Sequence, residues 1–382
     1  MKKLIVKTLV IAGIFFLVSC NEEEGVSNIE DLPFINPDAA EVYIGTQSPG
    51  DVWTWTIDRQ QGHMTASWDA GTFDDESDDI YIEGELETLP SGYFKVVINQ
   101  VEPANEEIPT DGSAWFYALE IPGMSLVIKP EGNIKGDMIA MIASGDCADV
   151  AGTFNYVLSA PGNGKEFDPL TEEAFGIAEF TPSGDGFSIS GQKFSLDCVD
   201  GGCTVNAPIS GLPTAICEGS GSVAILDGGT VAQGQFTQSG AMMMDFGYGN
   251  GGVFAMKASN VPTKSDLDGN TYLGLAYTPT DNDEQVRPVK VVFTQNEAGQ
   301  MEGIATVFTN IETGEVSDSE GATIFVDNVI DGRAQGYLTF PGSDGQSPMS
   351  SAYGIDGDNQ LLILSSFSQG DNSPFIVVLA KN

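Results

Sequence analysis

Catalytic side chains are sparse in this sequence of 382 residues. His63 is the single histidine, so a Ser–His–Asp or Cys–His site would have to use it. It lies in the turn-like segment 60–63, where we expect a solvent-exposed residue, and no Gly-x-Ser-x-Gly motif is present. Two carboxylates could hydrolyse a glycoside. With 55 Asp and Glu residues in the chain, however, the sequence does not indicate which two would form such a pair.

Calcium is the metal that the acidic loops suit best, because Ca²⁺ prefers hard oxygen ligands grouped on a loop. None of these loops has the spacing of the twelve-residue EF-hand, and Asp and Asn are also ordinary turn formers. Solvated turns are therefore the alternative for each cluster, and one histidine makes zinc unexpected. The candidate ligands that we retain are Asp281, Asp283 and Glu284.

All four tryptophans fall within residues 43–147. Trp53 and Trp55 alternate with polar residues, so we expect them to pack in a sheet core. Trp68 is followed by Asp-Ala-Gly and should lie near a strand end. It is the candidate for an exposed ring that contacts a ligand such as a sugar. Three methionines at 242–244 should fill a strand rather than form a binding surface.

Four cysteines beyond residue 20 predict disulfides, because an even number in an exported chain fits an oxidising compartment. Four cysteines allow three pairings. Cys198 and Cys203 flank Val-Asp-Gly-Gly, a hairpin-turn sequence that would bring the two thiols together. We therefore predict Cys198–Cys203 together with Cys147–Cys217.

The first 20 residues have the features of an export signal. Three lysines within the first seven residues precede a short apolar run at 9–18, whereas a membrane-spanning helix needs about 20 apolar residues. The run ends in Leu-Val-Ser-Cys at 17–20, which resembles the lipobox of bacterial lipoproteins. The resemblance covers this segment alone. It implies cleavage of residues 1–19 and lipidation of Cys20, whose acyl chains would anchor the protein in a membrane.

Residues 20–42 are predicted to form a lipidated acidic tether, since they contain two prolines and little periodicity. Asn21 follows the lipid site, where many Gram-negative lipoproteins retained at the inner membrane have Asp. The three glutamates at 22–24 resemble the surface-export signal of Bacteroidetes lipoproteins, and a merely solvated tether is the alternative. These resemblances imply the outer membrane or the cell surface.

The charge balance excludes one class of partner. The chain has 15 Lys and Arg residues against 55 Asp and Glu residues, a formal charge of −40. A nucleic-acid binder needs bases to neutralise phosphates, so nucleic acid is not expected as a partner. Anionic lipid surfaces would also repel the chain, so attachment to a membrane must come from the lipid on Cys20.

Strand patterns dominate the rest of the chain. Apolar residues alternate with polar ones or cluster with β-branched and aromatic residues, and Asp, Asn and Gly form turns between them. This predicts an all-β fold of tandem antiparallel β-sandwich or β-barrel modules. The strongest strand candidates are 53–58, 93–98, 115–119, 289–293, 323–326, 361–364 and 375–379.

A weak repeat divides the body. The stretch at 149–154 is echoed at 266–272, and Ala-Gln-Gly at 232–234 recurs at 334–336, with the offset falling from 117 to 102 residues. Extra residues in the earlier copy would explain the fall and would include Cys198, Cys203 and Cys217. We predict modules at 43–147, 148–262 and 263–382.

The function that these features favour is not enzymatic. The chain is predicted to be a lipid-anchored envelope or cell-surface lipoprotein whose β modules bind a glycan or protein ligand, mediate adhesion, or act as spacers. A secreted carboxylate-based, glycosidase-like hydrolase is the alternative. No cofactor other than Ca²⁺ is expected.

Overall fold

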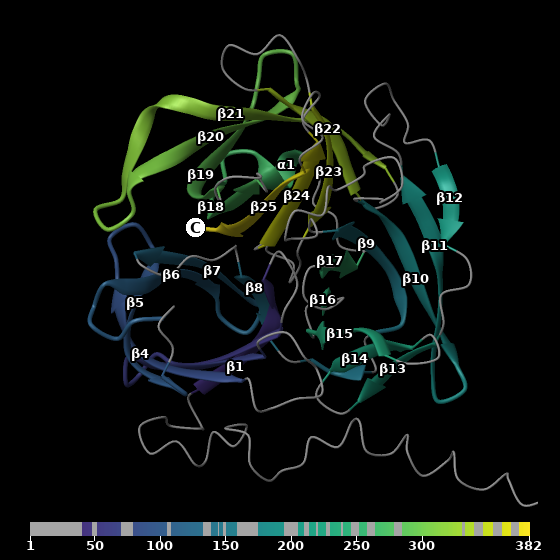
Figure 1. Ribbon diagram of the computed structural model, residues 1–382. Coiled ribbons are helices and arrows are strands. Elements are labelled where there is room, and N and C mark those ends of the chain that lie inside the picture. Colours follow the sequence, from purple (N-terminus) through teal and green to yellow (C-terminus); the bar gives the residue numbers. More distant parts are fainter. Residues whose placement is uncertain are drawn as a thin grey trace, which may run out of the picture.

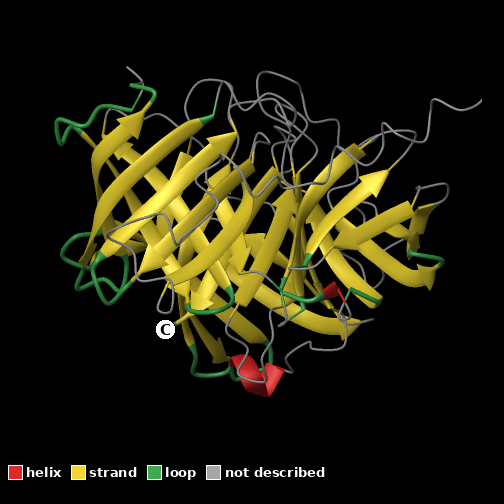
Figure 2. Ribbon diagram, turned by 90° about the horizontal axis from the view of Figure 1, so that it is seen from below, coloured by secondary structure: helices red, strands yellow, loops and turns green. Residues whose placement is uncertain are grey.

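The computed structural model describes the chain at residues 40–47, 52–69, 79–104, 108–132, 139–143, 145–147, 150–158, 175–194, 205–209, 214–218, 221–226, 230–237, 240–245, 252–257, 264–278, 285–330, 333–339, 347–353, 361–367 and 374–382. These residues contain twenty-five strands, one four-residue helix and the described turns between them, and all the strand pairings described are antiparallel. The all-β prediction is therefore confirmed, and Figure 2 shows how completely strands dominate. Within this part of the chain, no helix is long and apolar enough to cross a membrane.

The first eight strands close into a barrel, in which β1 pairs with both β2 and β8. The connections at 59–62, 89–93 and 122–124, which the structure describes in full, are short, as expected for an up-and-down barrel. The strands are β1 (Ala40–Gln47), β2 (Val52–Asp58), β3 (His63–Asp69), β4 (Ile80–Thr88), β5 (Phe94–Glu102), β6 (Ala114–Ile121), β7 (Ser125–Gly132) and β8 (Ile139–Ala143).

The interior of this barrel is filled with large side chains rather than with solvent. Trp55 is 0% exposed and Trp53 is 4% exposed, and both rings contact Phe116 edge-on. An eight-stranded barrel is just wide enough for side chains to fill it. The alternation at 53–58 predicted that these two rings would lie in the core, and the structure confirms it.

Nine strands form the second sheet, in the order β10-β9-β17-β16-β15-β14-β13-β11-β12. A further pairing of β10 with β11 links the first strand in this order to the last but one, so the sheet curves around its own core. The strands are β9 (Gly152–Leu158), β10 (Phe175–Ser183), β11 (Gly186–Phe194), β12 (Val205–Ile209), β13 (Thr214–Glu218), β14 (Ser222–Leu226), β15 (Thr230–Phe236), β16 (Ala241–Asp245) and β17 (Gly252–Lys257).

A second closed barrel of eight strands follows the short helix α1 (Lys264–Leu267), and β18 pairs with β25 to close it. The first and third sheets are thus barrels and not sandwiches. The strands are β18 (Thr271–Thr278), β19 (Gln285–Gln295), β20 (Met301–Asn310), β21 (Glu315–Ile330), β22 (Arg333–Thr339), β23 (Ser347–Tyr353), β24 (Leu361–Phe367) and β25 (Pro374–Lys381).

The three sheets pack side by side around one another, as Figure 1 shows. Their outer faces supply a single apolar cluster, which we call the shared core. Side chains that contact across the sheet boundaries are expected to hold the sheets together as one body. Among the members of the shared core are Tyr117, Leu119, Met243, Phe254, Leu275 and Val378.

The repeat landmarks agree with the topology only in part. Residues 152–154 lie on β9 and 271–272 lie on β18, the first strand of each sheet. The Ala-Gln-Gly motif, however, lies on β15, which two strands of its sheet follow, and on β22, which three strands follow. Between the two landmarks the second sheet has five strands and the third has three, so the extra residues lie where the falling offset predicts them.

Candidate functional site

A cleft of about 200 Å³ lies between the first barrel and the second sheet. We call it the intermodule cleft. Strands β1 and β2 form one wall, and β15 and β16 form most of the other. Its lining residues are six polar ones, four larger apolar ones and two glycines: Thr46, Thr54, Ser222, Gln233, Gln235, Asp245, Ile44, Val52, Met243, Met244, Gly45 and Gly234.

Strand alternation decides which side chains reach this cleft. On β1, Tyr43 belongs to the barrel interior, so Ile44 and Thr46 point outward from the barrel. On β16, Met242 and Met244 pack inside the second sheet, whereas Met243 lies in the shared core. Asp245 has the same parity as Met243 and therefore faces the first barrel.

The cleft contains a buried carboxylate. Asp245 is 2% exposed and Thr46 is 1% exposed, and the Thr46 hydroxyl donates a hydrogen bond of 2.9 Å to the Oδ1 atom of Asp245. These two residues are 199 positions apart in the chain. Gln233 is the register partner of Asp245 on β15, and Gln235 on the same strand is 1% exposed. The site thus depends on two sheets being correctly packed.

Gly234 allows the two strands of the far wall to approach closely. A Cβ atom at this position would collide with the Met243 carbonyl oxygen on β16. Glycine is the residue that permits such an approach of two backbones. The β15–β16 pair therefore needs Gly234 to keep its present register, in which Gln233 lies opposite Asp245.

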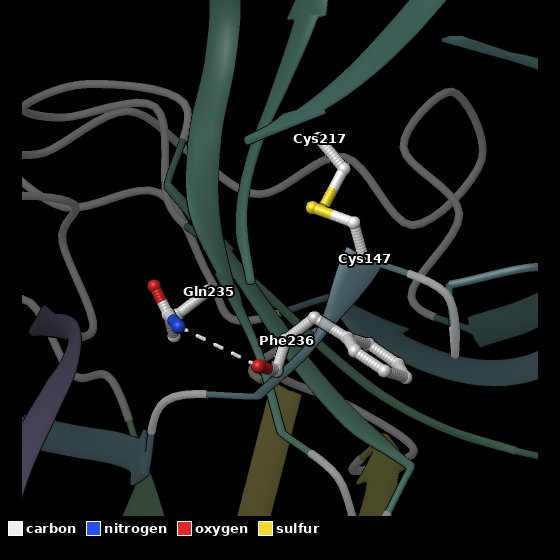
Figure 3. The surroundings of a disulfide bond; sticks show 4 residues. All are labelled: Cys147, Cys217, Gln235 and Phe236. Carbon is white, nitrogen blue, oxygen red and sulfur yellow. Dashed lines mark hydrogen bonds between the residues drawn. A yellow bond between two sulfur atoms is a disulfide. The ribbon is translucent and has the colours of Figure 1, made fainter. Parts of the chain in front are cut away.

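A disulfide connects the end of the first barrel to the second sheet. The structure joins Cys147, which follows the first barrel, to Cys217 on β13, with Cα atoms 5.5 Å apart. Figure 3 shows this bridge together with Gln235 and Phe236, whose carbonyl oxygen accepts a hydrogen bond from Gln235 Nε2 at 3.5 Å. This bridge is one of the two expected from the sequence, and it ties the first barrel to the second sheet.

A second polar cluster closes one end of the first barrel. The Arg59 guanidinium contacts both Glu41 and Glu120, and Glu120 is only 1% exposed. The Tyr43 hydroxyl lies 2.6 Å from a Glu41 oxygen and 2.7 Å from a Glu120 oxygen. The backbone N–H of Gly123 donates to Glu41 at 2.7 Å. Sequence reasoning did not single out this pair of carboxylates.

The arrangement keeps Glu41 ionised. Burial by itself would raise the pKa of Glu41, but hydrogen bonds from Arg59, Tyr43 and Gly123 outweigh it and lower the pKa to about 2. Burial and the two carboxylates raise the pKa of Tyr43 well above its ordinary value. A glycosidase acid must carry a proton near neutral pH. An ionised Glu41 is unsuited to that role, and the contacts of Arg59 with both carboxylates fit a structural role for the cluster.

Trp68 lies at the end of β3, where it stacks on Trp53 with ring centroids 5.2 Å apart and planes 5° apart. It is half-buried, whereas Trp53 and Trp55 are fully buried. One face of the ring is therefore used in packing. A ligand contact at Trp68 stays a prediction. His63 is half-buried at the start of β3, and so is less exposed than a turn residue would be.

Several predicted positions fall outside the described residues. Cys20 and the calcium candidates Asp281, Asp283 and Glu284 are among them, as are Cys198 and Cys203. The strands that flank the last two, β11 and β12, pair antiparallel, with Phe194 opposite Val205. Among the described residues, no group of three or more His, Cys, Asp or Glu side chains is placed to hold a metal ion. The Ca²⁺ site, the lipidation and the Cys198–Cys203 bridge stay predictions.

The fold and the cleft define an all-β protein of three packed antiparallel sheets with a polar cavity between two of them. Neither a protein-family model nor a curated protein matches the chain. Among solved structures, transferrin binding protein B of Neisseria meningitidis serogroup B aligns at 14% identity over 87% of this chain and 66% of its own, with a TM-score of 0.28.

Two further solved structures resemble this chain to a similar degree. A mutant of transferrin binding protein B from Haemophilus parasuis aligns at 11% identity over 91% of this chain and 66% of its own, with a TM-score of 0.27. A DUF3598-family protein of unknown function from Nostoc punctiforme aligns at 12% identity over 90% and 94%, with a TM-score of 0.24. The chain spans just under two thirds of the transferrin-binding proteins. Such slight likeness does not indicate its ligand.

Proposed function

We propose that this protein is a non-enzymatic, lipid-anchored lipoprotein of the outer membrane or cell surface whose β modules bind a ligand. The intermodule cleft is the observation that carries the binding role. It is concave, has both polar and apolar walls, and lies between two packed sheets, which is where ligand sites commonly occur. The ligand classes that we propose for the modules are a glycan or a protein, with Trp68 as a further contact.

The anchor is supported by the lipobox-like Leu-Val-Ser-Cys at 17–20 and by the apolar run before it. Replacing Cys20 with Ala should abolish labelling by radioactive palmitate and release the protein from the membrane fraction. Ser27→Ala is the matched control, because it changes a residue of the predicted tether without touching the signal or a disulfide. Continued labelling of the Cys20→Ala variant would refute the anchor.

Export to the cell surface can be tested separately. Replacing the three glutamates at 22–24 with serine should leave palmitate labelling intact and reduce digestion of the protein by protease added to whole cells. Equal digestion of both forms would show that the acidic run is only a solvated tether.

Binding without turnover is the central expectation. The full chain should bind members of a glycan or envelope-protein array and should release no reducing sugar from any glycan that it binds. Trp68→Ala is expected to weaken that binding if the half-buried ring contacts the ligand. Sugar release that Glu120→Gln abolishes would instead establish the hydrolase.

A further inference from the structure

Two strands of the third sheet extend beyond their barrel. In the ladders that the structure describes, β20 pairs with β19 only as far as Val307, and β21 pairs with β22 only from Thr323 onward. Residues 308–320 of these two strands therefore pair with each other alone, and we call them the ribbon. A two-stranded hairpin is at best marginally stable in water, so the ribbon needs contacts outside its own ladder.

The ribbon begins at a bend. The register of the β20–β21 ladder shifts three times between Ala305 and Asn310, whereas it is regular from Met301 to Ala305. Extra residues in one strand of a pair bend that strand and increase its twist. The ribbon is therefore directed away from the third barrel, and Figure 1 shows it reaching toward the first barrel.

Apolar contacts and an ion pair join the ribbon to the first barrel. Phe308 meets Tyr93 edge-on with ring centroids 5.7 Å apart, and Ile311 in the turn is 8% exposed within the shared core. The Lys95 ammonium donates to Glu312 at 2.6 Å. This pair lies at the rim of the contact, where the side chain of Lys95 is 22% exposed and that of Glu312 is 47% exposed. Salt should therefore screen it.

The contact also contains an unfavourable group. Gly314, at the turn of the ribbon, packs against Ser91 of the first barrel, because a Cβ atom at Gly314 would lie 3.4 Å from the Cα atom of Ser91. Ser91 is 9% exposed, and its hydroxyl is buried without a hydrogen-bond partner in the part of the chain that the structure describes. Burying an unpaired hydroxyl costs free energy, which hydration on opening would recover. The closed position of the ribbon is thus opposed by a group that the ribbon helps to bury.

We infer that the ribbon is a hinged flap, which lifts from the first barrel about the bend while both barrels stay folded. Lifting separates Phe308 from Tyr93 and admits water to Ser91. It also uncovers Tyr117, which is 6% exposed in the closed form and whose hydroxyl lies 3.3 Å from Glu312. The motion is separate from the ligand site proposed in the intermodule cleft.

Hydrogen exchange of the full chain under native conditions, measured by mass spectrometry, tests this motion. The ribbon is compared with residues 301–305 and 323–326, which belong to the same two strands but pair on both sides. Amides of the ribbon should exchange at least about a hundredfold faster, because local opening requires less free energy than global unfolding. Ile324→Val weakens the core inside the third barrel and should speed exchange in the two barrel segments about fivefold. It should leave exchange in the ribbon unchanged, because the flap opens with that core intact.

Two substitutions at the contact distinguish a flap from a hairpin that frays only at its tip. Ser91→Ala removes the buried hydroxyl, stabilises the closed position and should slow exchange in the ribbon about tenfold. Glu312→Gln removes the ion pair and should speed that exchange about threefold. Added salt should accelerate the wild-type ribbon more than the Glu312→Gln ribbon. Ser190→Ala and Glu179→Gln are the matched controls, because both residues are exposed on the second sheet and should leave the ribbon unchanged.

The inference is overturned if the ribbon exchanges as slowly as the two barrel segments. It is also overturned if Ile324→Val accelerates all three segments equally, since the ribbon would then open only by global unfolding. Unchanged exchange of the ribbon in both Ser91→Ala and Glu312→Gln overturns it as well, because the ribbon would then exchange without leaving the first barrel.

Discussion

Arg59 balances the charges of Glu41 and Glu120, because its guanidinium binds both carboxylates at the end of the first barrel. Glu120 is nearly inaccessible to solvent, and its charge needs this partner. Removing one member of a buried ion pair leaves an uncompensated charge, which costs more than the pair itself contributes.

Arg59→Met should lower the free energy of unfolding by about 3 kcal/mol, because it leaves the buried Glu120 carboxylate without its cation. Denaturant titration measures the change. Arg287→Met is the matched control, since Arg287 is exposed on β19 and its replacement should change stability by less than about 0.5 kcal/mol. Equal effects of the two substitutions would contradict the structural role of Arg59.

Glu41 should make the stability of the protein depend on pH in the acid range. Its pKa is about 2 in the folded protein and near 4.5 when unfolded, so the unfolded state binds the proton first. The stabilisation is thus present above about pH 4.5 and is lost as the pH falls toward 2. The measurement is the wild-type minus Glu41→Gln difference in unfolding free energy, which should shrink over this interval. A constant difference would show that Glu41 is not held ionised.

At the scale of elements, the disulfide constrains strands that are far apart in the sequence. The Cys147–Cys217 bridge spans 70 residues and connects the end of the first barrel to β13 of the second sheet. Cys217 packs against the core inside the second sheet, to which Phe236 on β15 also belongs (Figure 3).

Replacing Cys147 and Cys217 with Ala should destabilise the protein by about 4 kcal/mol, because a closed loop of this length removes much conformational entropy from the unfolded chain. The predicted Cys198–Cys203 bridge closes a much shorter loop, and its double Ala variant should lose only about 2 kcal/mol. Chemical denaturation of both variants without reductant measures these losses. The reverse order would contradict the loop-length argument.

The whole molecule is held together by contacts that cross sheet boundaries. The Tyr93 hydroxyl of the first barrel donates to the Gly274 carbonyl oxygen of the third sheet at 2.7 Å. Lys95 pairs with Glu312 at 2.6 Å, and the shared core lies beneath. Independent spacer modules in a row would not need such contacts. The sheets instead resemble one body assembled from three units (Figure 1).

We therefore expect a single calorimetric unfolding transition for the full chain. Tyr93→Phe should move the whole transition to lower temperature, corresponding to about 1 kcal/mol, because it removes one buried hydrogen bond between two sheets. The expressed fragment 148–382 should bind a hydrophobic dye, since it would expose the Met243 and Leu275 side of the shared core. Two or more separate transitions in the full chain would show that the sheets unfold independently.

Local sequence patterns were sufficient for the fold class and for the positions of many strands. Alternation at 53–58 predicted that Trp53 and Trp55 would be buried, as they are. Gly184 and Asp185, two residue types typical of turns, join β10 to β11. Such patterns work because a strand exposes its two faces in strict alternation, so a few neighbouring residues carry the information. They could not distinguish a sandwich from a barrel, since closure depends on the pairing of β1 with β8.

The intermodule cleft was decided by tertiary structure alone. Thr46 and Asp245 are 199 residues apart, and each is an ordinary polar residue in its own strand. Neither residue type nor spacing marks them, because their proximity arises only when the outer faces of two sheets pack together. The Glu41–Arg59–Glu120 cluster has the same origin. The sequence by itself therefore determined the strands and the shortage of catalytic groups, whereas long-range packing determined where polar groups meet.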